Sequence, residues 1–156
     1  MKIFIHGLES TSTGTKGKWF NTHFPEVLVS DFPGSLDERM SKLNSLLTGH
    51  ENIVLIGSSY GGLMASLYAL ENEGRVKKVI LFAPALNFSE FDQYVDQSTS
   101  APAILYVGSQ DDICPPDRVI PVAKKVFTNL AVHLSEDDHL LKKTFRFLDW
   151  QTLLTL

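Results

Sequence analysis

A short motif in the middle of the chain carries the clearest signal for chemistry. Residues 57–61 read Gly-Ser-Ser-Tyr-Gly, which satisfies the pattern G-x-S-x-G with Ser59 at its centre. An apolar run precedes the motif and a helix-like segment follows it, which is the strand, turn and helix context that the pattern requires. A serine on such a strained turn needs glycine two positions before and two positions after it. Ser59 is therefore a candidate nucleophile.

Other interpretations of the same glycines are possible. A phosphate-binding loop would need lysine where Leu63 stands, so that interpretation fails. Ser58 is a rival nucleophile, but the residue two positions after it is Tyr60 and not glycine. The glycines could also serve only to save space where a strand meets a helix, and this alternative stays open.

A serine hydroxyl is a weak nucleophile unless a histidine accepts its proton and a carboxylate orients that histidine. Asp111 and Asp112 follow an apolar run over residues 103–107, and His139 follows another over residues 131–134. Acids at the carboxyl end of a parallel strand face the crevice in which such sheets bind ligands. The two aspartates could instead form a solvated turn, and His139 could simply start a helix.

The first apolar run ends in His6, Gly7 and Leu8. A turn at this position can lend a main-chain N–H to the oxyanion that forms when a serine attacks a carbonyl, and the residue after the nucleophile lends a second. The candidates for these two N–H groups are Leu8 and Tyr60. We interpret His6 as a residue that shapes the loop and borders the substrate pocket.

Short apolar runs alternate with helix-like segments along the chain. Strands are predicted at residues 3–5, 27–29, 53–56, 79–82, 103–107 and 131–134, and helices at residues 35–47, 63–72, 117–127 and 140–150. Most runs are continuously apolar, which is typical of strands buried on both faces. The pattern predicts a mostly parallel sheet of about six strands with helices on both faces, in one domain over residues 1–156.

Residues 87–102 form the one long irregular stretch. Phe88 and Phe91 lie there at helical spacing with acidic residues among them. The segment is either a short apolar cover over a pocket, to which Phe88 and Phe91 would contribute, or a surface helix. In either case the chain has no room for a large cap domain.

Composition excludes several classes of function. The net charge is −4 and the cationic residues are dispersed, which argues against nucleic-acid binding. No apolar run is long enough to cross a membrane or to form a signal peptide, so we expect a cytoplasmic protein. The single cysteine, Cys114, allows neither an internal disulfide nor a thiolate zinc site, and we expect no metal and no cofactor.

Taken together, these residues resemble the α/β-hydrolase superfamily, and specifically its small bacterial YqiA-type esterases. The similarity extends along the chain and rests on these segments: His-Gly-Leu at residues 6–8, Gly-Ser-Ser-Tyr-Gly-Gly at residues 57–62, Ala-Pro-Ala at residues 83–85, Gly-Ser-Gln-Asp at residues 108–111 and Asp-His at residues 138–139. Acidic residues at positions 136 and 137 replace the glycines that this group carries before its histidine.

The resemblance implies a three-layer α/β-hydrolase fold with Ser59 as nucleophile, Asp111 as acid and His139 as base. The implied activity is hydrolysis of small-molecule carboxylic esters with short acyl groups, through an acyl-enzyme. Three alternatives remain: an inactive hydrolase scaffold that only binds, a thioester or amide hydrolase, and an acyltransferase. The sequence leaves the oligomeric state open, as well as the possibility that Asp112 replaces Asp111.

Overall fold

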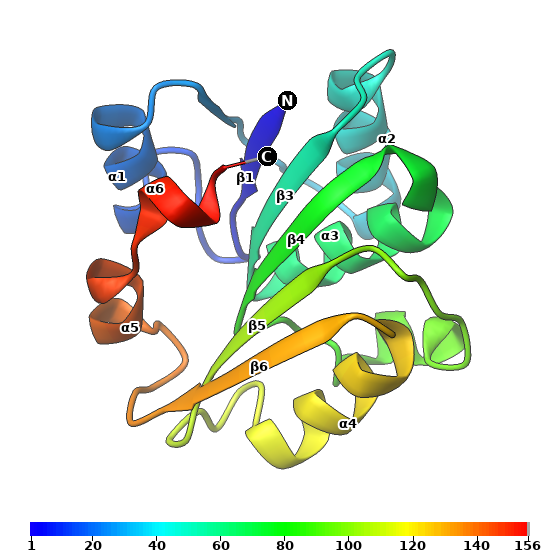
Figure 1. Cartoon of the computed structure of the whole chain (residues 1–156), viewed down its shortest axis with the longest axis vertical. Helices are drawn as coiled ribbons and strands as arrows, with labels where there is room; N and C mark the ends of the chain where they lie inside the picture. Colours follow the sequence, from blue (N-terminus) through cyan, green and yellow to red (C-terminus); the bar gives the residue numbers. More distant parts are fainter. Residues whose placement is uncertain (156) are drawn as a thin grey trace.

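Six parallel strands form one sheet, as the sequence predicts (Figure 1). The computed structural model describes residues 1–155. The strands are β1 (Lys2–Ile5), β2 (Val27–Val29), β3 (Ile53–Ser58), β4 (Val76–Phe82), β5 (Ala103–Gly108) and β6 (Leu130–Ser135). Their spatial order is β2-β1-β3-β4-β5-β6, and each neighbouring pair is parallel.

The helices cover both faces of the sheet (Figure 1). They are α1 (Thr15–His23), α2 (Leu36–Leu47), α3 (Tyr60–Glu71), α4 (Pro116–Val126), α5 (Lys142–Phe147) and α6 (Trp150–Leu153), with short 3-10 helices η1 (Glu73–Arg75) and η2 (Ser89–Tyr94). Helices α2, α3 and α4 pack with one core cluster, and α1, α5 and α6 pack with the other. The predicted three-layer architecture is therefore confirmed.

The central strands alternate between the two clusters. In β3, Ile53 and Leu55 face the α2, α3 and α4 side, whereas Val54 and Ile56 face the α1, α5 and α6 side. All four side chains are fully buried. Burial on both faces explains why the sequence of this strand is continuously apolar and does not alternate with polar residues.

Helix α1 was not predicted, and the single helix predicted over residues 140–150 was wrong. Helix α1 occupies part of a stretch without apolar periodicity, and its buried residues are only Gly17 and Phe20, so the usual stripe that marks a helix is missing. The single helix predicted over residues 140–150 is divided into α5 and α6. Asp149 stands between them and caps α6 by accepting a hydrogen bond from the Thr152 N–H.

The order of the strands creates a crevice between β1 and β3. From β1 the chain passes outward to β2, then returns to β3 on the other side of β1 and proceeds to β6. Ligands bind outside the carboxyl ends of parallel strands at such a reversal, because the loops from the two neighbouring strands diverge there. These two loops begin at His6 and at Ser59, the segments in which the sequence predicts chemistry.

Among residues 1–155, no helix combines the length and the apolar composition that crossing a membrane requires.

Candidate active site

Ser59 occupies the turn between β3 and α3 in a strained backbone conformation. Its φ of 55° and ψ of −116° lie outside the regions that a residue with a side chain normally adopts. Main-chain hydrogen bonds hold it there: its N–H donates to the Phe82 carbonyl, and its carbonyl accepts from Gly62, Leu63 and Ala85. Such a turn exposes the Ser59 hydroxyl at the carboxyl edge of the sheet.

The glycines on either side of Ser59 are required because backbone approaches backbone at both positions. A Cβ atom on Gly57 would lie 2.4 Å from the Gly61 carbonyl oxygen. A Cβ atom on Gly61 would lie 2.0 Å from the carbonyl oxygen of Ile5 at the end of β1. Side chains at these positions would push the turn away from β1, so the glycines do more than save space between a strand and a helix.

A continuous chain of hydrogen bonds joins Ser59, His139 and Asp111. The Ser59 Oγ lies 2.9 Å from His139 Nε2, and His139 Nδ1 lies 2.8 Å from Asp111 Oδ2. An ionised carboxylate can only accept, so Nδ1 donates to Asp111 and the lone pair on Nε2 faces the Ser59 hydroxyl. This tautomer is the one in which the imidazole can take a proton from Ser59.

The two adjacent aspartates have different environments. The Asp111 side chain is fully buried, and its Oδ1 accepts hydrogen bonds from the N–H groups of Ile113 and Cys114 at 2.9 and 2.8 Å. Asp112 is exposed. The geometry therefore favours Asp111 over Asp112 as the partner of His139.

Asp137 positions the loop that carries His139, a role that the sequence analysis missed. Its carboxylate accepts hydrogen bonds from the N–H and hydroxyl of Thr144 and from the N–H of Asp138. Burial alone would raise the pKa of Asp137, but these hydrogen bonds lower it below its ordinary value. The acid at this position thus fastens the loop to the start of α5.

Cys114 is unsuited to act as a nucleophile. It is fully buried beneath the Asp111 loop. Burial and, secondarily, the negative charge of Asp111 raise the pKa of its thiol to about 12, so the thiol stays protonated at neutral pH.

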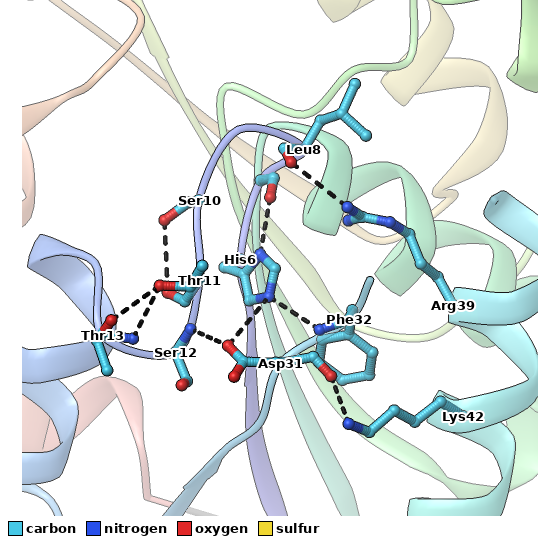
Figure 2. Close-up of polar contacts among 11 residues, drawn as sticks. His6, Leu8, Ser10, Thr11, Ser12, Thr13, Asp31, Phe32, Arg39 and Lys42 are labelled. Carbon is cyan, nitrogen blue, oxygen red and sulfur yellow. Dashed lines mark hydrogen bonds and ion pairs between the residues drawn. The ribbon is translucent and has the colours of Figure 1, made fainter. Parts of the chain in front are cut away.

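The arm that follows β1, residues 6–8, runs beside Ser59. Figure 2 shows the polar contacts that His6 and Leu8 of this arm make. A Cβ atom on Gly7 would lie 3.4 Å from the Cβ of Ser59, so the two backbones are close. Among residues 1–155, no hydrogen-bond acceptor engages the main-chain N–H of Leu8 or of Tyr60. Both N–H groups are therefore without an acceptor in the described part of the chain, and their role at an oxyanion stays a prediction.

His6 holds this arm in place through both ring nitrogens. The Phe32 N–H donates to His6 Nε2 at 3.0 Å, so Nδ1 carries the proton and donates to the Gly7 carbonyl at 2.7 Å (Figure 2). The Gly7 carbonyl and the Leu8 N–H belong to one planar peptide unit, so fixing one fixes the direction of the other. Arg39 contacts the same arm by donating to the Leu8 carbonyl at 3.4 Å.

A cavity of about 670 Å³ opens at Ser59 and His139. Its volume is in the range of small-molecule sites. His6, Leu8, Tyr60 and Phe88 contribute to its lining.

Phe91 does not line the cavity, and its assignment to the substrate pocket was wrong. The residue lies in η2, is fully buried and packs in the core cluster on the α2, α3 and α4 side. Its spacing from Phe88 suggested a shared face, but only Phe88, which precedes η2 and is partly buried against the same cluster, also reaches the cavity.

Comparisons with known proteins agree on the fold. The family described as "alpha/beta hydrolase fold" matches residues 34–100. Mouse alpha/beta hydrolase domain-containing protein 10 superimposes with a TM-score of 0.77 at 18% identity, over 99% of this chain and 90% of that chain. Est1E from Butyrivibrio proteoclasticus gives a TM-score of 0.76 at 16% identity, over 99% and 88%.

A Paleococcus ferrophilus monoacylglycerol lipase gives a TM-score of 0.75 at 16% identity, over 92% of this chain and 90% of that chain. No curated protein matches the sequence. The chain therefore has the α/β-hydrolase fold, which confirms the resemblance to that superfamily at the level of the fold. The narrower resemblance to the YqiA-type esterases stays a prediction.

We expect Gly61→Ala to destabilise the protein by about 1–3 kcal/mol, the usual cost of forcing atoms into a packed site. The added Cβ meets the main chain of β1, which cannot rotate away as a side chain can. Gly74→Ala is the matched control, because a Cβ atom there meets nothing within 4 Å. Urea unfolding of both variants measures the difference, and equal midpoints would contradict the close approach.

We expect His6→Phe to lose about 2 kcal/mol of stability, since it keeps a ring but leaves the buried Phe32 N–H without its acceptor. Amide hydrogen exchange at Phe32 should accelerate in the same variant. His50→Phe provides the control, because His50 is an exposed histidine in the loop before β3. Unchanged exchange at Phe32 would show that His6 does not hold the arm.

Proposed function

We propose that this protein is a serine hydrolase that cleaves small-molecule carboxylic esters through Ser59, His139 and Asp111. One observation carries the proposal: the unbroken chain of hydrogen bonds from Ser59 Oγ through the imidazole to the buried Asp111 carboxylate. Esterase and lipase names among proteins of the same fold add support. Fold by itself does not determine function, so the hydrogen bonds among Ser59, His139 and Asp111, and not the fold, carry the proposed activity.

In the proposed mechanism, Ser59 Oγ attacks the ester carbonyl carbon while its proton passes to His139 Nε2. Asp111 keeps the imidazole in the required tautomer and stabilises the imidazolium that forms. The protonated Nε2 then gives its proton to the departing alcohol, which leaves an acyl group on Ser59. Water repeats the sequence with His139 as base and releases the acid.

The oxyanion that develops on the carbonyl oxygen would accept hydrogen bonds from the N–H groups of Leu8 and Tyr60. Neither N–H has another acceptor among residues 1–155. Tyr60 is also the first residue of α3, so the positive end of that helix dipole points in the same direction. Donors held in advance in this way can lower the barrier by several kcal/mol, about 3 for a single one.

The proposed substrates have short acyl groups. From residues 87–102, where a cover would have to lie, only Phe88 reaches the cavity. Of the two aromatic residues of η2, Phe91 belongs to the core and Tyr94 packs against it. The part of a long alkyl chain that reaches beyond the cavity would therefore extend into water and gain nothing from burial.

We expect a fluorophosphonate probe to form one covalent adduct on the wild-type protein and none on Ser59→Ala. Intact mass spectrometry reads the adduct directly. Ser58→Ala is the matched control, because it removes the neighbouring hydroxyl and should still be labelled. Absence of any adduct between about pH 6 and 9, a range that spans histidine titration, would favour an inactive scaffold that only binds ligands.

The rate constant kcat for nitrophenyl acetate should fall by on the order of 10³-fold or more in Ser59→Ala, since the members of such a triad act as a unit. Across nitrophenyl esters from acetate to palmitate, we expect kcat/KM to be highest for short chains. A maximum at palmitate would contradict the short-chain proposal without affecting the assignment of Ser59.

A further inference from the structure

Three cationic side chains line the cavity that contains Ser59. They are Lys16 near the start of α1, and Lys142 and Arg146 on α5. Glu9 is the only carboxylate residue in the lining. The whole chain carries a net charge of −4, so this excess of positive charge runs against the composition of the protein.

None of these three cations forms an ion pair with an acid in the described residues. Within residues 1–155, no carboxylate lies within 4.0 Å of the charged nitrogens of Lys16, Lys142 or Arg146. Lys142 and Arg146 are exposed at the cavity, and no acceptor in the described residues takes a hydrogen bond from their side chains. Their charges are therefore available to a ligand.

Lys16 is the most enclosed of the three. Its Nζ donates to the Leu140 carbonyl at 2.6 Å and lies 5.6 Å from the centre of the Phe145 ring. Burial, opposed in part by Asp137 and Asp138 and reinforced by Lys142, lowers the pKa of Lys16 to about 8. A cation in this setting gains stability when an anion approaches it.

The rest of this side of the cavity is apolar. Trp19, Leu140 and Phe145 line it together with Phe4 from β1. An apolar wall with a few cationic groups suits a ligand that has a hydrocarbon part and one charged end, because the wall lowers the local dielectric and strengthens the charge contact.

We propose that the substrate of this site is an ester that carries an anionic group, a carboxylate or a phosphate, and that Lys16, Lys142 and Arg146 bind that group. This inference rests on the proposed function, since it identifies the class of ester that Ser59 cleaves. Arg146 can bind a carboxylate or phosphate through two parallel N–H donors, and the two lysines add point charges.

Two pairs of esters test the inference, one for each side of the ester bond. Nitrophenyl hemiglutarate is compared with nitrophenyl pentanoate, which replaces the distal carboxylate by a methyl group. In the second pair, acetoxybenzoate carries its charge on the phenol that leaves, and the methyl ester of acetoxybenzoate is its neutral counterpart. We expect kcat/KM to be about tenfold higher for the anionic member of at least one pair, as for a hydrogen bond to a charged group.

The double variant Lys142→Gln/Arg146→Gln should remove most of that preference and leave the rate with the neutral ester within about twofold. Lys143→Gln is the matched control, because Lys143 is an exposed cation on α5 that does not line the cavity. The preference should also weaken as salt is added, since screening acts on exposed charges. The absence of a preference in both pairs, or a preference that survives in the double variant, would overturn the inference.

A binding measurement separates this inference from the proposed function. In Ser59→Ala, the tryptophan fluorescence is followed during titration with monomethyl glutarate, inorganic phosphate and the neutral dimethyl glutarate. Of the two tryptophans that contribute to this signal, Trp19 lines the cavity and Trp150 packs against Trp19. We expect at least one anion to bind more tightly than the neutral diester, and the Lys142→Gln/Arg146→Gln substitutions to abolish the difference. Anion binding without any Ser59-dependent hydrolysis would reject only the proposed function, whereas equal binding of all three would reject the anion site.

Discussion

The close approach of the Ser59 turn to the end of β1 is the contact on which the rest of the site depends. Gly61 rests against the carbonyls of Ile5 and His6 with no room for a Cβ atom. This contact brings two loops from neighbouring strands together, one with the serine and one with the Leu8 N–H. A strained residue such as Ser59 costs about 1–3 kcal/mol, and its four main-chain hydrogen bonds keep it in place.

The polar part of the site is held by hydrogen bonds that are buried or partly buried. Asp111 accepts from two main-chain N–H groups, and Asp137 fixes the turn before α5. On the other side of Ser59, His6 links the arm to Phe32, in the segment between β2 and α2. Side chains fixed in this way lose little further freedom when a substrate binds, which is the requirement for electrostatic preorganisation.

The same helices that cover one face of the sheet also shape the cavity. Phe20 of α1 and Phe145 of α5 pack in one aromatic cluster with Phe82 of β4. The residues adjacent to them on the same helices, Trp19 before Phe20 and Arg146 after Phe145, line the cavity. Core packing therefore determines where the cationic groups stand relative to Ser59, and changes in either helix would alter both stability and ligand preference.

Local patterns in the sequence determined much of the molecule. Continuous apolar runs predicted the central strands because burial on both faces leaves no polar alternation. The glycine spacing identified Ser59 because the turn excludes side chains. The helix predicted over residues 35–47 corresponds to α2, whose start is fixed by a capping box between Ser35 and Glu38. These features depend on residues close together in the chain, so a sequence is sufficient to reveal them.

Only the tertiary structure decided which distant groups meet. Asp111 and Asp112 are alike in sequence, and burial under two N–H donors distinguishes them. Helix α1 lacks an apolar stripe, and its position depends on packing against Phe145 and Trp150, so the contribution of Lys16 and Trp19 to the cavity could not be predicted. The burial of Phe91 in the core likewise depends on tertiary packing and not on its spacing from Phe88. Such contacts join residues far apart in the chain, and their energies are settled by the packing of the complete fold and not by local preference.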